Sequence, residues 1–221
     1  MRKAVIFDMD GVLIDSEPAY LEMNFKLFDE LGIEMPEEEY KDFVGMDSLK
    51  MWTMIKNKYG LSESAEELRL KEKNLMKNLL EAGADSMTVR GIPELIREFR
   101  KKNYALSLAS SSSRENIDTV ISKINLREHF DFVISGDEVK SGKPEPDIFL
   151  RVASEFNLTP DKCFVIEDSF NGVTAAKKAG MYCIGFSTDN SNSQDLSGAD
   201  LIVNSFTEKD STELLKFIED N

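Results

Sequence analysis

Six short apolar runs, each of strand length, recur along the 221-residue chain and are separated by segments of helical periodicity. The runs are apolar throughout and do not alternate with polar residues, which predicts strands that are buried on both faces. In the intervening segments apolar residues recur every three or four positions, as in Ile92, Leu95, Ile96 and Phe99. We therefore predict an α/β fold whose core is a doubly wound parallel sheet of the Rossmann-like kind. The six runs are residues 4–7, 104–109, 132–134, 163–166, 182–186 and 201–203.

Residues 15–83 break this alternation. They contain several helical patterns, among them Tyr20, Met23, Leu27 and Leu31, and no convincing strand. The chain is long enough for one domain with an insertion. We expect a Rossmann-like core formed by residues 1–14 and 84–221, with an α-helical cap domain, residues 15–83, inserted after the first strand.

The charge balance restricts the partners. The chain has 27 Lys and Arg against 41 Asp and Glu, a formal net charge of −14. Such a chain repels phosphate backbones, so we expect no nucleic acid partner. A phosphorylated ligand would need a locally positive pocket or a metal ion.

Features that the sequence lacks lead to expectations about the protein's location and oligomeric state. No window approaches a membrane-spanning helix, and the apolar run before Asp8 is too short for a signal peptide. Cys163 and Cys183 have no disulfide or zinc-site spacing. We expect a cytoplasmic monomer with reduced, buried thiols and no membrane partner.

Asp8 and Asp10 follow the first predicted strand. If the strand continues through them, alternation puts both side chains on one face with Cα atoms about 6.6 Å apart, from a rise of about 3.3 Å per residue. Two carboxylates in that position repel each other and favour a bound cation. Oxygen ligands of this kind suit Mg²⁺, which the sequence predicts as the cofactor.

Polar residues also follow three other predicted strands, where ligands of parallel sheets bind. Ser110 to Ser113 offer hydroxyls and backbone N–H groups for phosphate oxygens. Lys143 lies in a segment that Pro144 and Pro146 stiffen. Glu167 and Asp168 add a second acidic pair that suits Mg²⁺. A carboxylate pair, hydroxyls, a lysine and a second acidic pair are the groups needed for phosphoryl transfer.

The order of these motifs resembles the haloacid dehalogenase superfamily. The resemblance rests on Phe7-Asp8-Met9-Asp10-Gly11-Val12, the Ser110 loop, Lys143-Pro144 and Glu167-Asp168-Ser169, and it includes the inserted cap. Residues 15–18, 141–149 and 167–176 look like the branch that contains β-phosphoglucomutase and sugar-phosphate phosphatases.

The resemblance implies roles for particular residues. The family's first aspartate is the nucleophile and its second is the general acid and base, which implies these roles for Asp8 and Asp10. Ser110 matches the phosphate-binding hydroxyl, and Lys143 matches the lysine that offsets the charge of nucleophile and phosphoryl group. The implied metal-site residues are Asp8, Asp10 through its carbonyl, Asp168 and Glu167, with direct contact between Glu167 and Mg²⁺ left open.

Substrate contacts are also implied by the resemblance. The cap of the family closes over the site and chooses the leaving group. For Lys73, a solvated helix face is an equally good interpretation. The residues expected to meet the substrate are Ser111, Ser112, Arg114, Gly45, Met46 and Lys73.

These expectations favour a phosphatase that hydrolyses a small phosphorylated sugar or similar metabolite through an aspartyl phosphate on Asp8. The alternative is a β-phosphoglucomutase that interconverts β-glucose 1-phosphate and glucose 6-phosphate. That enzyme carries a histidine where this chain has Tyr20 and an arginine where it has Ser48, and both departures weaken the mutase interpretation. A non-catalytic phosphoacceptor switch is more distant, because receiver domains lack the cap and the DxDG arrangement.

Overall fold

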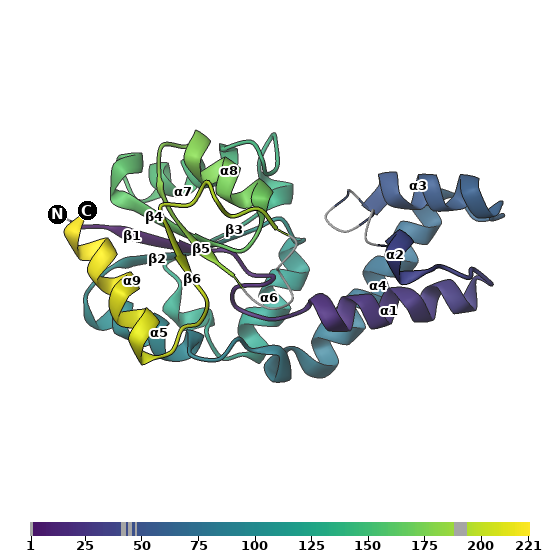
Figure 1. The fold of residues 1–221 in the computed structure, drawn as a ribbon, viewed down its shortest axis with the longest axis horizontal. Coiled ribbons are helices and arrows are strands. Elements are labelled where there is room, and N and C mark those ends of the chain that lie inside the picture. The colour runs from purple at the N-terminus through teal and green to yellow at the C-terminus, as the bar shows by residue number, and fades with distance from the viewer. Residues whose placement is uncertain (1, 41–42, 44–45, 47, 188–193) are drawn as a thin grey trace. The chain divides into compact units, whose positions relative to one another are not determined.

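The computed structural model describes residues 2–40, 43, 46, 48–187 and 194–221. The chain divides into two compact units (Figure 1). Met1–Ser16 and Ala84–Asn221 form one, which we call the sheet unit, and Glu17–Gly83 form the other, the helical unit. Their roles as catalytic core and cap stay predictions.

The sheet unit is built on six parallel strands in the order β3-β2-β1-β4-β5-β6. Every predicted run coincides with a strand to within one residue at either end. The predicted fold class, an α/β fold with a doubly wound parallel sheet, is confirmed. The strands are β1 (Ala4–Phe7), β2 (Ala105–Ser110), β3 (Phe132–Ser135), β4 (Cys163–Glu167), β5 (Tyr182–Phe186) and β6 (Leu201–Val203).

Helices cover both faces of this sheet (Figure 1). α7 and α8 pack on one face, and α5 and α9 lie on the other. β1 lies between β2 and β4, so the strand order reverses next to it. The bounds are α5 (Ile92–Lys101), α6 (Arg114–Lys123), α7 (Asp147–Glu155), α8 (Phe170–Lys178) and α9 (Glu208–Asp220), with short 3₁₀ turns η2 (Ala84–Met87), η3 (Arg127–His129), η4 (Gly136–Glu138) and η5 (Pro160–Lys162).

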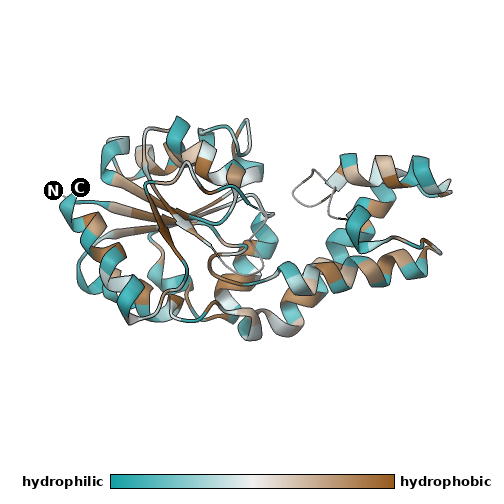
Figure 2. Ribbon diagram, viewed as in Figure 1, coloured by the Kyte–Doolittle hydropathy of each residue, from teal (hydrophilic) through white to brown (hydrophobic). Residues whose placement is uncertain are grey.

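Alternate residues of each central strand enter two separate apolar layers. On β1, Ala4 and Ile6 pack in a cluster with Phe149 of α7 and Val165 of β4. The ring of Phe7 packs edge-on against Phe99 and Phe130, with ring centroids 6.0 Å apart in both pairs. The strands are accordingly the most hydrophobic ribbons of this unit (Figure 2). Burial on both faces is the reason that the apolar runs show no alternation.

The helical unit is a small bundle with its own core. Trp52, Phe28 and Ile55 are among its fully buried side chains, and no strand occurs among its described residues. Within the described part of the chain, no helix combines the length and the apolar character needed to cross a membrane. The helices are α1 (Glu17–Glu30), α2 (Glu37–Tyr40), α3 (Ser48–Tyr59) and α4 (Ala65–Gly83).

Candidate active site

The ends of β1, β2 and β4 bring Asp8, Ser110 and Glu167 to one edge of the sheet. Phe7 pairs with Leu108 and Ile166, and the backbone N–H of Asp8 still donates to the Ile166 carbonyl at 3.0 Å. Because adjacent parallel strands end at the same edge, the residues that follow them are neighbours in space.

The strand-alternation argument for Asp8 and Asp10 is wrong, because β1 ends at Phe7. Beyond it the chain enters a turn in which Gly11 has a φ of 80° and donates its N–H to the Ile14 carbonyl at 2.8 Å. The turn, and not a continuing strand, places the two aspartates at the site.

Gly11 also makes room for Asp168. A Cβ on Gly11 would lie 1.9 Å from Asp168 Oδ2, which is far inside van der Waals contact. The glycine therefore satisfies two requirements at once: a left-handed backbone and close approach of a carboxylate.

Lys143 joins the nucleophile candidate to Glu167. Its ammonium lies 2.5 Å from Asp8 Oδ1, 2.7 Å from Glu167 Oε1 and 3.1 Å from the Ala109 carbonyl. Its side chain is only 5% exposed, so this cation is held almost entirely out of water. All three donor directions of the ammonium are used, which fixes its position.

Both oxygens of Glu167 have protein partners. Oε1 accepts from Lys143, and Oε2 accepts from the backbone N–H groups of Asp168 and Ser169, both at 3.0 Å, and from the Ser169 hydroxyl at 2.9 Å. A Cβ on Gly172 would lie 1.8 Å from the Glu167 carboxyl group. Glu167 therefore lies in a cradle formed by the start of α8.

Among the described residues at this edge of the sheet, carboxylates outnumber cations. Burial and the charge of Glu167 raise the pKa of Asp168, and Asp8 raises it further. Burial also raises the pKa of Asp8 against the lowering effect of Lys143. Burial lowers the pKa of Lys143, but Asp8 and Glu167 raise it more, so the lysine stays charged.

Among the described residues, no three His, Cys, Asp or Glu side chains are arranged as a ready-made metal site. Lys143 already lies between two of the candidate acids, Asp8 and Glu167. The donor chemistry nevertheless fits a hard cation: Asp168 lies over the Gly11 turn, and a bound cation would offset the repulsion among the buried carboxylates.

Hydroxyl groups hold Asp10. Ser16 Oγ donates to Asp10 Oδ1 at 2.8 Å, and Ser112 Oγ donates to Asp10 Oδ2 at 2.7 Å. Ser110 Oγ accepts from the Ser112 N–H at 3.0 Å, an interaction that does not use the Ser110 hydroxyl proton. Sequence reasoning missed Ser16, since nothing in its spacing from Asp10 marks it.

The structure brings Ser112 to Asp10 but gives Arg114 other neighbours. The Arg114 guanidinium donates to the Val133 carbonyl at 3.0 Å, to Glu138 at 3.1 Å and to Asp118 at 3.2 Å. Ser111 is exposed at the start of the same loop.

The residues expected in the cap are described in part. Met46 packs against the apolar core of the helical unit, and Lys73 lies on the exposed side of α4. Gly45 lies outside the described residues. The substrate contacts expected of these residues stay predictions.

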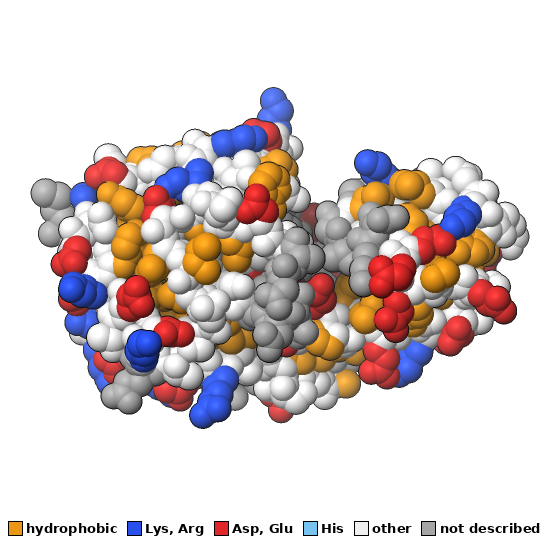
Figure 3. Space-filling model, in the orientation of Figure 1, with side chains coloured by type: hydrophobic (Ala, Val, Ile, Leu, Met, Phe, Trp, Pro, Cys, Tyr) orange, Lys and Arg blue, Asp and Glu red, His pale blue; other side chains and the backbone are white. Residues whose placement is uncertain are grey.

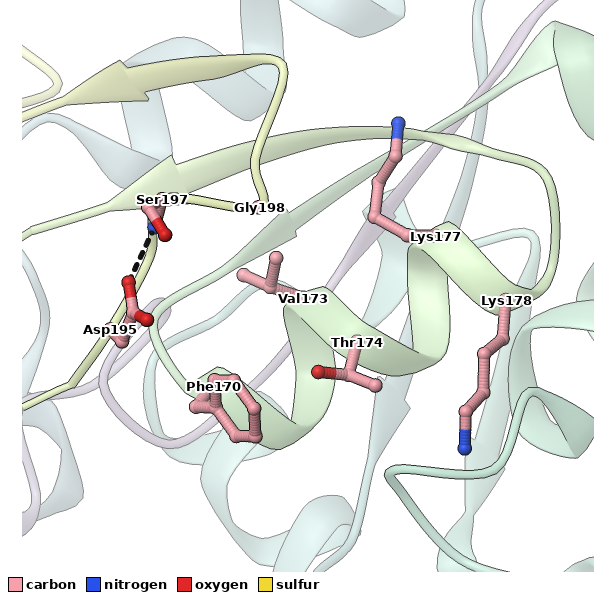
Figure 4. A pocket seen from close by; sticks show the side chains of 8 residues that line it. All are labelled: Phe170, Val173, Thr174, Lys177, Lys178, Asp195, Ser197 and Gly198. Carbon is pink, nitrogen blue, oxygen red and sulfur yellow. Dashed lines mark hydrogen bonds between the residues drawn. The ribbon is translucent and has the colours of Figure 1, made fainter.

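A hollow of about 450 Å³ lies elsewhere on the sheet unit (Figure 4). One wall is formed by residues of α8 from Phe170 to Lys178, and the other by the chain from Asp195 to Gly198. Lys177 is already bound to Asp200, and Lys178 to Glu145. Its lining lacks the concentration of acids and hydroxyls found at the strand ends.

Charges of both signs are interspersed over the face of the protein in Figure 3. Lys and Arg form no continuous patch on that face. The positive charge at the strand ends is instead the buried ammonium of Lys143.

Comparison with known proteins identifies the class. The haloacid dehalogenase-like hydrolase family matches residues 5–186, and the chain belongs to this family. It is 32% identical over 183 residues to a phosphorylated carbohydrates phosphatase of Thermotoga maritima, covering 81% of this chain and 82% of that protein. It is 27% identical over 207 residues to a β-phosphoglucomutase of Bacillus subtilis, covering 91% and 88%.

A solved structure gives the same picture. CbbY from Rhodobacter sphaeroides, in complex with xylulose-(1,5)bisphosphate, superimposes with a TM-score of 0.80 at 25% identity, covering 94% of this chain and 96% of that one. The family resemblance predicted from the motifs is confirmed. The family and its phosphatase and phosphomutase members support a phosphoryl-transfer hydrolase.

Proposed function

We propose that this protein is an Mg²⁺-dependent phosphatase that hydrolyses a small phosphorylated sugar or similar metabolite through an aspartyl phosphate on Asp8. The observation that carries the proposal is the Lys143 ammonium between Asp8 and Glu167 at 2.5 and 2.7 Å. A buried cation beside a carboxylate is suited to holding a phosphoryl group next to its attacker.

The first half-reaction transfers the phosphoryl group to the protein. A carboxylate oxygen of Asp8 attacks phosphorus, and the bond from phosphorus to the ester oxygen breaks. Asp10 gives a proton to the departing alcohol. The Ser110 hydroxyl donates to a phosphoryl oxygen, and the nearby positive charge of Lys143 offsets the charge that develops on the phosphoryl group.

The second half-reaction returns the protein to its starting state. Asp10 takes a proton from a water molecule, whose oxygen attacks the phosphorus of the aspartyl phosphate. The bond to Asp8 breaks, and inorganic phosphate leaves. Splitting hydrolysis into two displacements lets one buried carboxylate act at both stages.

Asp8, Asp168 and the backbone carbonyl of Asp10 would hold the Mg²⁺ ion. When bound, it supplies positive charge that draws the phosphate dianion to a protein of net charge −14 and stabilises charge in the transition state. Glu167 contributes by holding Lys143 and the 168–169 turn.

Two departures from the mutase favour the phosphatase. A mutase must hold two phosphate groups, and this chain has Tyr20 and Ser48 where that enzyme carries a histidine and an arginine. Both hydroxyls donate to Glu72 inside the helical unit. A relative named as a β-phosphoglucomutase keeps the alternative open to test.

The experiment is ³¹P NMR of the purified protein with Mg²⁺ and a panel of sugar phosphates that includes β-glucose 1-phosphate and the bisphosphate primer. Growth of inorganic phosphate, and the ester that disappears fastest, support the proposal and name the substrate. Conversion of β-glucose 1-phosphate into glucose 6-phosphate without matching phosphate release would establish the mutase instead.

Asp8→Asn is the matched control, because it keeps the shape of the side chain and removes the nucleophile. We expect it to fold and to make no phosphoenzyme. Appreciable turnover by this variant would rule out the aspartyl phosphate. The absence of any turnover by the unmodified protein over the panel would favour the phosphoacceptor switch.

We also propose where the protein is located and in what oligomeric state it works. Buried, unpaired Cys163 and Cys183 are compatible with a reducing cytoplasm. A single copy holds the whole proposed chemistry in the sheet unit, so we propose a monomer, which sedimentation of the purified protein tests.

A further inference from the structure

The Asp10 carboxylate is held by one hydroxyl on each oxygen. Ser16 Oγ is 2.8 Å from Oδ1, and Ser112 Oγ is 2.7 Å from Oδ2. Ser112 is 102 positions away in the chain and reaches Asp10 from the loop after β2. A carboxylate with a donor on each oxygen has its plane fixed, whereas with a single donor it can rotate about its own axis.

Ser112 is itself held from two sides. Its backbone N–H donates to Ser110 Oγ at 3.0 Å, and its carbonyl accepts from Ser135 Oγ at 2.7 Å. Ser135 is fully buried at the end of β3, where it also accepts the Asp137 N–H and caps η4. The end of a third strand thus fixes the backbone that presents the Ser112 hydroxyl.

We infer that Ser112 is a positioning residue for Asp10, and that Ser135 supports it. This inference rests on the proposed function, in which Asp10 gives a proton to the leaving alcohol. The Ser112 hydroxyl keeps the carboxyl group directed for that transfer and does not bind the substrate. Correct orientation of an acid is a large part of its effect on the rate.

A comparison of two phosphate esters distinguishes the positioning of Asp10 from a role of Ser112 in substrate binding. A sugar alkoxide leaves only with a proton from Asp10, whereas nitrophenolate is stable enough to leave without one. The value of kcat/KM reports the steps up to departure of the leaving group. Loss of Asp10 positioning should therefore slow the sugar phosphate more than 4-nitrophenyl phosphate.

We expect Ser112→Ala to lower kcat/KM for the preferred sugar phosphate by about tenfold and for 4-nitrophenyl phosphate by less than about threefold. Ser112→Thr, which keeps the hydroxyl, should stay within about threefold of the unmodified protein for both esters. Ser135→Ala should shift the ratio of the two esters in the same direction by a smaller factor. Ser122→Ala, the same change on the exposed side of α6, is the control and should leave both values unchanged.

A double-mutant cycle tests whether Ser112 acts through Asp10. In an Asp10→Asn background, Ser112→Ala should cost no more than about twofold, because the group that it positions is already gone. A further tenfold loss in that background would overturn the inference. An equal loss for both esters in Ser112→Ala would also overturn it and would assign Ser112 to phosphate binding.

Failure of the inference is distinguishable from failure of the proposed function. If Asp8→Asn abolishes turnover while Ser112→Ala leaves the ratio of the two esters unchanged, the phosphatase stands and the inference falls. If Asp8→Asn retains turnover, the proposed function falls, and the inference falls with it. Thermal unfolding of each variant shows that it is folded before its kinetics are compared.

Discussion

The indole Nε1 of Trp52 donates a hydrogen bond of 2.9 Å to the Glu72 carboxylate inside the helical unit. The hydroxyls of Tyr20 and Ser48 donate to the same carboxylate, so Glu72 joins α1, α3 and α4. Glu72 is only 3% exposed. Burial and the charge of Glu72 raise the pKa of Tyr20, which keeps its hydroxyl proton available for this bond.

Replacing Glu72 should destabilise the helical unit. Glu72→Leu leaves the buried Trp52 N–H and two partly buried hydroxyls without this acceptor, and we expect a loss of about 2–4 kcal/mol in the free energy of unfolding. Glu72→Gln should cost less, because the Tyr20 and Ser48 hydroxyls can rotate to accept from the amide. Urea unfolding followed by fluorescence of Trp52, the only tryptophan, measures the loss.

The control for this prediction is Glu66→Gln, on the exposed side of the same helix. It should change the free energy of unfolding by less than about 0.5 kcal/mol. Equal stability of Glu72→Leu and the unmodified protein would show that the buried carboxylate has no net stabilising effect, as is known for some buried charges.

Gly172 should tolerate no side chain. An added Cβ would lie 1.8 Å from the Glu167 carboxyl, so Gly172→Ala must displace Glu167, which in turn holds Lys143. We expect a loss of more than about 2 kcal/mol in the free energy of unfolding, together with loss of turnover. Gly142→Ala is the matched control for stability, because nothing lies within 4 Å of its added Cβ.

Much of the sheet unit could be predicted because its strands are buried on both faces and therefore read as apolar runs. The candidate site followed from the same reasoning, since parallel strands place Asp8, Ser110 and Glu167 at one edge. The turn at Gly11 could not be derived from strand periodicity, which stops at Phe7.

The buried polar contacts were harder to predict. Glu72 lies in a stretch rich in Lys and Glu, which reads as solvated, although it falls in register with the buried Leu68, Met76 and Leu80. This helical spacing was the feature of the sequence that could have identified Glu72 as buried. The contacts of Ser16 and Ser112 with Asp10 join segments that no local pattern relates, so only the folded chain reveals them.

The two thiols should be unreactive in the folded protein. Burial raises the pKa of Cys163 to about 12, and burial raises that of Cys183 as well. At pH 8 only about one Cys163 thiol in 10⁴ is then ionised, and both sulfurs are shielded from reagents. We expect a disulfide reagent to label less than about a tenth of the thiols in native buffer and both in guanidinium chloride. Rapid labelling of the native protein would contradict the burial of these residues.

Removal of Asp168 should abolish stabilisation by Mg²⁺. A ligand that binds only the folded protein adds about 2.7 kcal/mol at a concentration of 100 Kd, so Mg²⁺ should raise the thermal midpoint of the unmodified protein. Burial, Glu167 and Asp8 raise the pKa of Asp168, which means that its charged form is unfavourable where it lies. Asp168→Ala should therefore be at least as stable as the unmodified protein when both are measured without Mg²⁺, and its thermal midpoint should not respond to the ion.

The control is Asp220→Ala, which replaces an exposed aspartate at the end of α9 and should keep the full response. A normal Mg²⁺ response in Asp168→Ala would move the proposed metal site away from this carboxylate.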